Sequence, residues 1–158
     1  MFYIEKVNGK EEKQSITLVT MNALPEWFSN PEEIMQKSYI HRECPFFVAY
    51  DGANIIGFIA LYPHNEKVAE LYTVAVLREY HQQAVAKNLF SAALHETASV
   101  RYQYITAKIP DSHEHSEMFT PVREFLISES FIELEHFSSL PTTKEPVSYW
   151  IKRVNYSL

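Results

Sequence analysis

Glycine is scarce in this sequence, with only 3 residues in a chain of 158. Globular proteins usually contain roughly 7% glycine, and this chain has no glycine-rich loop of the kind that normally cradles phosphates. Cysteine is scarcer, because Cys44 stands alone. A disulfide within the chain is therefore impossible, and a reducing cytoplasm is the expected location.

Positive charge and long apolar runs are also lacking. The chain has 14 Lys and Arg against 20 Asp and Glu, with a net charge of −6. General nucleic-acid binding needs a basic face, so we expect no nucleic-acid partner, although a local basic patch stays possible. No apolar run approaches the roughly 18 residues of a membrane span, and the charged N-terminal segment is not a signal peptide. We therefore expect no membrane association.

The composition is that of a globular protein rich in aromatic side chains. Hydrophobic residues make up 46% of the chain, charged residues 22% and aromatic residues 14%. This length fits one domain with a substantial core, which we expect to span residues 1–158. Aromatic residues favour strands and line pockets.

Alternation and turn signals predict a mostly antiparallel start to the fold. Asp51-Gly52 between two apolar runs is the clearest hairpin signal, and Asn8-Gly9 predicts either a second hairpin or a longer loop. Asn30-Pro31 is typical of a helix start. The predicted strands cover residues 2–7, 16–20, 46–50, 55–62, 69–76, 102–109, 131–137 and 147–153. The predicted helices cover residues 22–28, 32–41, 83–99 and 116–128.

The centre of the chain predicts a parallel crossover. A strand over residues 69–76, a helix over residues 83–99 and a strand over residues 102–109 should form a right-handed unit. The fold class is therefore α/β, or more closely an α+β mixed sheet, with a central mixed β-sheet flanked by helices on both faces.

Residues 68–87 have the layout of a phosphate-binding site. A strand, a short turn and a helix follow one another, and the first turn of a helix offers unpaired N–H groups to an anion. The turn contains no glycine, so its backbone must serve without the residue that best adopts positive φ. Lys87 is placed to add charge to the phosphates, although taken alone it is better explained as a solvated lysine on a first helical turn.

The element order and three strings resemble the GCN5-related N-acetyltransferase (GNAT) superfamily. The resemblance covers residues 16–153. Its strings are PFFVAYDGANIIGFIAL (residues 45–61), AELYTVAVLREYHQQAVAKNLFSAAL (residues 69–94) and VREFLISESFIELE (residues 122–135). In the second string, alanine stands at both small positions of the family's loop signature.

This resemblance implies acetyl-CoA as the acyl donor and no metal. Backbone amides of the loop would bind the pyrophosphate, and the end of the preceding strand would pair with the pantetheine arm. The loop residues so implied are His81, Gln82, Gln83, Ala84, Val85, Ala86 and Lys87. The strand residues are Val74, Ala75 and Val76, which taken alone read as an ordinary buried strand. Alanine in the loop costs little at negative φ and about 1 kcal/mol at positive φ.

Glu70 stands where some family members carry a catalytic glutamate. The resemblance implies that it takes the proton of the acceptor amine, directly or through water. Regular alternation would put Glu70, Tyr72, Val74 and Val76 on one face of the strand. The alternative for Glu70 is a charged strand start that faces solvent. Trp27, Phe28 and Tyr72 are the implied acceptor-binding residues, with core packing as their alternative.

The tyrosine that acts as general acid in many family members is missing. Leu126 occupies its position, Ser130 occupies that of a nearby glycine, and Ser128 is the remaining hydroxyl in this helix. His113 and His115 read as surface residues and not as metal ligands. Cys44 has no evident histidine partner, so a structural thiol is expected.

Three functional interpretations follow. The first is a cytoplasmic N-acetyltransferase that transfers acetyl from acetyl-CoA to a primary amine in a ternary complex. The second is a catalytically degenerate GNAT-fold binding or regulatory module. The third, an unrelated α+β domain, requires that strands 69–76 and 102–109 are not parallel neighbours. The acceptor is open among small molecules, peptide N-termini and lysine side chains, and a homodimer is plausible.

Overall fold

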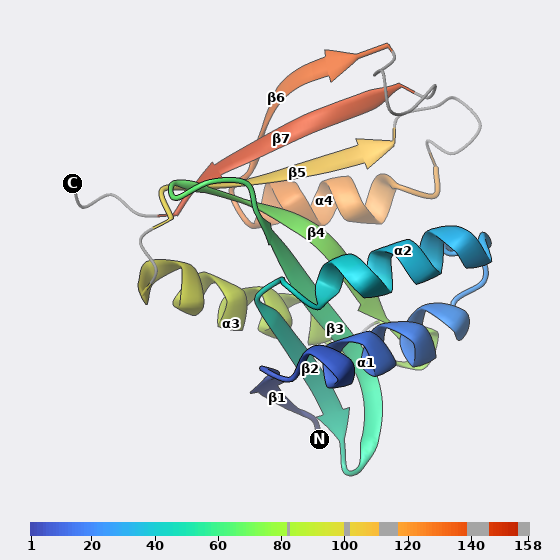
Figure 1. The fold of residues 1–158 in the computed structure, drawn as a ribbon. Helices are drawn as coiled ribbons and strands as arrows, with labels where there is room; N and C mark the ends of the chain where they lie inside the picture. Colours follow the sequence, from blue (N-terminus) through green and yellow to red (C-terminus); the bar gives the residue numbers. More distant parts are fainter. Residues whose placement is uncertain (82, 100–101, 111–116, 139–145, 155–158) are drawn as a thin grey trace.

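A single seven-stranded sheet runs through the protein in a computed structural model that describes residues 1–81, 83–99, 102–110, 117–138 and 146–154. The strand order is β1-β2-β3-β4-β5-β7-β6 (Figure 1). The strands are β1 (Tyr3–Lys6), β2 (Phe46–Asp51), β3 (Asn54–Pro63), β4 (Val68–Val76), β5 (Tyr104–Pro110), β6 (Ile132–Phe137) and β7 (Val147–Arg153). The helices are α1 (Lys10–Asn22), α2 (Pro31–His41), a short 3₁₀ helix η1 (Arg78–Tyr80), α3 (Val85–Ser99) and α4 (Thr120–Ser128).

Helices cover both faces of the sheet, as predicted (Figure 1). α1 and α2 pack on one face through a core that includes Ile16, Ile34 and Phe58. α3 and α4 pack on the other face through a core that includes Leu89 and Leu126. The mixed α+β class is therefore confirmed. None of the helices among the described residues is both long and apolar enough to cross a membrane.

The predicted parallel crossover is also confirmed. β4 precedes α3 in the chain, β5 follows it, and the two strands pair in parallel. Their pairing is short and joins only residues 68–70 to residues 104–106. Beyond it the two strands diverge like the arms of a V (Figure 1). The interpretation as an unrelated α+β domain required that these strands were not parallel neighbours, and it is rejected.

The strand predicted over residues 16–20 is wrong, because these residues lie inside α1. The β-branched run suggested a strand. The buried positions of α1 follow helical spacing instead, and they include three polar residues, Lys13, Thr17 and Thr20. The Lys13 ammonium donates to the carbonyl oxygen of Cys44 at 2.7 Å, so this buried charge has a partner that the sequence pattern did not reveal.

Two neighbouring predictions change with it. Gly9 is the N-cap of α1, with φ of −71°, and not part of a hairpin turn. The helix predicted over residues 22–28 is absent, because α1 ends at Asn22 and turns follow. Asn30 does cap α2, since its side-chain oxygen accepts hydrogen bonds from two backbone amides of the first turn. The hairpin of β2 and β3 is confirmed, and the remaining helices and strands shift only at their ends.

His41 is the most deeply buried ionisable ring in the described part of the chain, with 0% exposure. Its Nδ1 lies 2.8 Å from Thr17 Oγ1, and its Nε2 lies 2.9 Å from Thr73 Oγ1. Burial, together with the charge of Lys37, lowers the pKa of His41 from 6.5 to about 3. The neutral ring therefore connects α1 and α2 to the middle of β4.

This burial predicts a loss of stability in mild acid. The folded pKa of His41 lies below the unfolded value of 6.5, so unfolding takes up a proton below that pH. The free energy of unfolding should fall by up to about 1.4 kcal/mol per pH unit between pH 6.5 and pH 4 from this group alone. Urea unfolding across that range measures the slope. His41→Gln should have a shallower slope, and equal slopes in the two proteins would contradict the assignment.

Candidate cofactor and acceptor site

The divergence of β4 from β5 leaves a free strand edge in the middle of the sheet. Among the residues that the structure describes, β4 beyond Glu70 pairs with β3 on one side only. The amide of Leu77 donates to Ile56 O at 2.8 Å. Because backbone groups alternate along a strand, those of Ala75 then face β3, and those of Val74 and Val76 face the opening. An extended molecule can therefore pair with Val74 and with the amide of Val76, since the Val76 carbonyl already lies 2.7 Å from His81 Nε2.

A bulge at Tyr72 overturns the predicted alternation along β4. Ala60 pairs with Thr73 and Leu61 pairs with Leu71, so Tyr72 is an extra residue. Thr73 then shares the face of Tyr72, since both contact His41. Val74 instead packs with Val76 against the α3 core. The prediction that Val74 and Val76 share a face with Glu70 and Tyr72 is wrong, because a bulge shifts the alternation by one residue.

Glu70 is buried, with 4% exposure, and does not face solvent. Its Oε1 lies 2.7 Å from His64 Nε2 and 3.2 Å from Lys108 Nζ. Burial opposes the charge of Lys108, yet Glu70 and Tyr149 outweigh it and raise the pKa of Lys108. The carboxylate is thus held by the Lys108 ammonium of β5 and by the His64 ring in the turn after β3. An oriented buried carboxylate of this kind is suited to proton transfer.

Tyr72 lies at the centre of an aromatic and cationic group beside Glu70. Its ring centroid lies 5.5 Å from that of Tyr62 and 4.3 Å from the ammonium of Lys37 on α2. Burial raises the pKa of Tyr72, with Glu70 adding to the effect. Burial also lowers the pKa of Lys37. The predicted base and the predicted acceptor residue Tyr72 therefore lie in one cluster.

We refer to this group as the acceptor cluster. It consists of Lys37, Tyr62, His64, Glu70, Tyr72, Lys108 and Tyr149. Sequence reasoning found Glu70 and Tyr72 and missed the other five. They come from α2, β3, β5 and β7 and the turn after β3, and no spacing along the chain relates them.

The loop between β4 and α3 is held at three points. His81 Nε2 lies 2.7 Å from Val76 O, and Tyr80 donates to Asp51 at 2.8 Å. Arg78 forms an ion pair with Glu26 at 2.5 Å. These contacts attach η1 to the end of β4, to the β2–β3 hairpin and to the segment before α2.

The predicted loop residues differ in what they can offer an anion. Gln83, Ala84 and Lys87 are exposed, whereas Val85 is buried and can offer only its backbone. Ala86 is half-buried in the first turn of α3. Gln82 lies outside the described residues. The exposed set therefore surrounds the start of α3, where N–H groups are unpaired.

Two non-glycine residues of the described chain have positive φ: Ala84, at the first small position of the loop signature, and Ser130, at the glycine position that the resemblance implies after α4. Ala84 has φ of 58° immediately before α3, and Ser130 has φ of 68° after α4. The amide of Ser130 donates to Ile127 O and that of Phe131 donates to Leu126 O. This is the Schellman end of a helix, where glycine is preferred. The backbone thus keeps the glycine conformation after glycine is lost.

Ala84→Gly should therefore stabilise the protein. The left-handed conformation costs an L-residue about 1–2 kcal/mol, and we expect a gain of about 1 kcal/mol in the free energy of unfolding by urea. Ser130→Gly is the matched control, with a similar gain far from the loop. Of the two variants, only Ala84→Gly should also increase the affinity for acetyl-CoA, because its backbone can approach the phosphates more closely. Unchanged free energies of unfolding in both variants would contradict the claim that these two residues are strained.

Trp27 and Phe28 form part of the packing before α2. Both are partly buried against the α1 and α2 core. The Trp27 ring also meets Phe119 edge-on at 5.8 Å between centroids. These contacts bring the segment before α2 against α4, so the core-packing alternative describes them well. Their acceptor role stays a prediction.

The remaining sequence candidates offer little chemistry. Leu126 is buried in the α3 core, and the Ser128 hydroxyl donates to Phe125 O at 2.7 Å within α4. Burial raises the pKa of Cys44 to about 11, which makes it a poor nucleophile. His113 and His115 lie outside the described residues. Within those residues no group of three or more His, Cys, Asp or Glu side chains could hold a metal.

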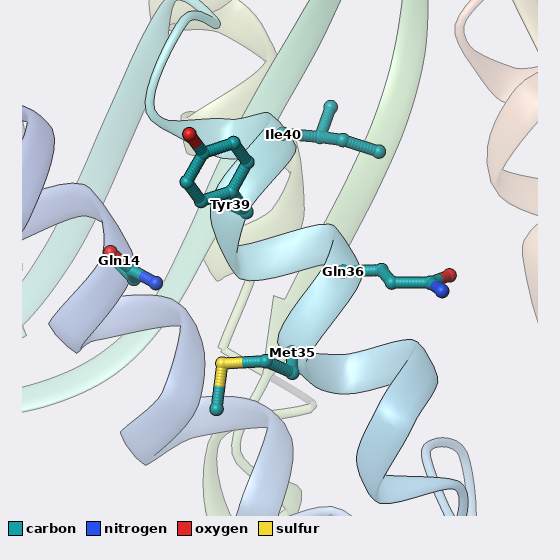
Figure 2. Close-up of a pocket in the computed structure, with 5 residues that line it drawn as sticks. All are labelled: Gln14, Met35, Gln36, Tyr39 and Ile40. Atoms are coloured by element: carbon teal, nitrogen blue, oxygen red, sulfur yellow. The ribbon is translucent and has the colours of Figure 1, made fainter.

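A shallow hollow of about 410 Å³ lies between α1 and α2. Figure 2 shows Met35 and Tyr39 of α2 on the side toward Gln14 of α1, while Gln36 and Ile40 point away. No charged side chain lines it. The acceptor cluster with its titratable groups is therefore the better candidate for chemistry.

Comparison with known proteins gives a consistent family. The family model described as Acetyltransferase (GNAT) family matches residues 14–119, more than half of the chain. A comparison with curated proteins finds no significant match.

Solved structures share the fold at low sequence identity. The ribosomal-protein-S18-alanine N-acetyltransferase of Escherichia coli has a TM-score of 0.77 and 10% identity, covering 100% of this chain and 97% of that one. The aminoglycoside 6'-N-acetyltransferase of Enterococcus faecium has a TM-score of 0.73 and 14% identity, covering 99% of each chain. A GNAT family acetyltransferase of Elizabethkingia anophelis with acetyl-CoA bound has a TM-score of 0.71 and 13% identity, covering 96% and 97%.

Proposed function

The chain belongs to the acetyltransferase (GNAT) family, and from this premise we propose that it transfers the acetyl group of acetyl-CoA to a primary amine. The observation that carries the proposal is the free edge of β4 beside a buried carboxylate. Val74 and Val76 offer backbone groups at that edge, and Glu70 lies on the same strand a few residues earlier. A structural relative with acetyl-CoA bound supports the choice of donor.

The residues present fit acetyl-CoA through their backbone. The N–H groups of Ala84 and Ala86 stand at the start of α3, where the helix dipole favours an anion, whereas the Gln83 amide already donates to Tyr80 O at 3.2 Å. Lys87 is exposed on the first turn and adds a positive charge. The positive φ of Ala84 places the loop in the conformation that glycine usually provides. This geometry supports the proposal that the loop binds pyrophosphate without a glycine.

The chemistry needs a base and no covalent enzyme intermediate. The amine nitrogen forms a bond to the thioester carbon, the carbon–sulfur bond breaks, and the amine proton passes to Glu70 directly or through water. His64 and Lys108 hold the carboxylate in place. Because Leu126 cannot protonate the departing thiolate, water must supply that proton. Cys44, with its raised pKa, takes no part as a nucleophile.

We also propose that residues 1–158 act as one domain in the cytoplasm, in keeping with the single cysteine and the acidic composition. The sheet ends at β6, where Ile132 and Leu134 are exposed. An apolar sheet edge of this kind supports the expected homodimer, which would cover it.

Release of free thiol from acetyl-CoA, measured against a panel of primary amines, tests the proposal. Turnover that depends on the amine supports the transferase. Binding of acetyl-CoA without turnover on any amine would favour the second interpretation, a binding or regulatory module. That alternative draws on Leu126 at the position of the missing tyrosine and on Ala84 and Ala86 at the two small positions of the loop, where glycine is usual.

A further inference from the structure

The acceptor cluster contains a cation that no carboxylate neutralises by contact. The Lys37 ammonium lies over the face of Tyr72, 4.3 Å from the ring centroid. Glu33 precedes it by one helical turn, the spacing at which exposed ion pairs form on helices. Even so, none of the carboxylates that the structure describes forms an ion pair with Lys37. The ammonium lies against the Tyr72 ring, and Glu33 attracts it without forming an ion pair.

Glu70 attracts Lys37 only without contact, because its carboxylate already contacts two other groups. Its Oε1 accepts from Lys108 at 3.2 Å and lies 2.7 Å from His64 Nε2. Two ammonium groups, those of Lys37 and Lys108, thus share one buried carboxylate. Glu33 and Glu135 are the other acidic groups near this region, and both side chains are exposed. The cluster is locally cationic although the whole chain has a net charge of −6.

A partly buried ammonium without an anion is unfavourable, since burial removes its hydration. Burial lowers the pKa of Lys37, which is the expected response to that cost. A ligand with a carboxylate would neutralise the charge of Lys37. It would form a charge-assisted hydrogen bond in a region where water is partly excluded.

The aromatic rings limit the shape of such a ligand. The centroids of Tyr62 and Tyr72 lie 5.5 Å apart, and the Lys108 ammonium lies 5.5 Å from the ring of Tyr149. Tyr62 is the cross-strand neighbour of Glu70, so the Tyr62 and Tyr72 rings place apolar surface beside the carboxylate, while Lys37 and Lys108 supply the charge. Polycationic amines are disfavoured here because they would meet two ammonium groups.

We propose that the acceptor is a small amino acid, whose carboxylate pairs with Lys37 while its amino group faces Glu70. This inference rests on the proposed acetyl transfer and narrows its substrate class. The products would be an N-acetyl amino acid and free CoA. The reaction is balanced by transfer of one amine proton to Glu70 and from there to solvent.

Matched pairs of acceptors test the proposal on the wild-type protein. Each free amino acid is compared with its primary amide, which has the same size but no carboxylate, and kcat/KM for acetyl transfer is measured. We expect at least a tenfold preference for the acid. The comparison is stringent, because an amide lowers the pKa of the neighbouring amine and so favours the competing substrate.

Substitutions at Lys37 then locate the preference. Lys37→Met should remove it by raising KM for the acid about tenfold, with little change for the amide, and Lys37→Arg should retain most of it. Lys10→Met is the control, because Lys10 is an exposed cation paired with Glu43 on another part of the surface. It should leave both values unchanged.

The outcomes distinguish failure of the amino-acid proposal from failure of the proposed acetyl transfer. Equal kcat/KM for acid and amide, or a preference for amides or polyamines, overturns the amino-acid proposal and leaves the transferase standing. A wild-type preference for the acid that survives in Lys37→Met overturns the role of Lys37. Absence of transfer to every amine, with acetyl-CoA bound, overturns the proposed function itself. The wild-type comparison decides the first question even if a variant fails to fold.

Discussion

Glu70→Gln should lower the turnover number for acetyl transfer by about two to three orders of magnitude, within the range of about 10²–10⁴ that general acid–base catalysis contributes. Glutamine has the size of glutamate but cannot accept the amine proton. The affinity for acetyl-CoA should change little, because the predicted cofactor contacts are backbone groups beyond Val74. The measurements are kcat by thiol release and Kd by calorimetry on the same preparation.

The Glu70 prediction needs a control for the ion pair with Lys108, which the substitution also breaks. Glu5→Gln alters an exposed carboxylate on β1 and should leave both kcat and Kd unchanged. Urea unfolding of Glu70→Gln reports any structural loss separately. Full turnover in a folded Glu70→Gln protein would remove Glu70 from the chemistry and leave it as the structural partner of Lys108.

Gly57→Ala should destabilise the protein by about 1–3 kcal/mol, the usual effect of forcing an extra methyl group into a packed site. A Cβ at Gly57 would lie 2.8 Å from Ala75 O and 3.2 Å from Val76 Cα. Both contacts are with backbone atoms of β4, so no side chain can move aside. The displaced segment is the free edge itself, and acetyl-CoA affinity should fall as well.

Gly9→Ala is the matched control for this substitution. Its nearest contact would be the Glu12 Cβ at 3.5 Å, an ordinary separation, and its φ of −71° suits alanine. Stability and cofactor affinity should stay close to wild type. If Gly57→Ala is as stable as Gly9→Ala and binds acetyl-CoA normally, the close packing of β3 on β4 does not shape the cofactor edge.

The parts of the fold that the sequence predicts well are those with strong local signals. The β2–β3 hairpin has Asp51-Gly52, α2 has the Asn30 cap, and the crossover around α3 has a clear helical period. Helix α1 escaped prediction because Lys13 and Thr17 count as polar in any pattern. They are buried through hydrogen bonds to residues far along the chain.

The residues of the candidate site that lie on one strand could be predicted from the sequence. Those that come together only when distant segments pack could not. Glu70 and Tyr72 lie in one string; family resemblance pointed to Glu70, and strand alternation placed Tyr72 on the same face. The bulge at Tyr72 depends on the register against β3, so simple alternation misplaced Val74 and Val76. Lys37 and Lys108 reach the cluster only when α2 and β5 pack beside β4.

Calorimetric titration of the wild-type protein with acetyl-CoA tests the central claim most directly. The claim is that the free edge of β4 and the glycine-free turn before α3 form a working acyl-CoA site. The account predicts saturable binding with a micromolar Kd, weakened in Gly57→Ala. No detectable binding at millimolar acetyl-CoA would contradict it.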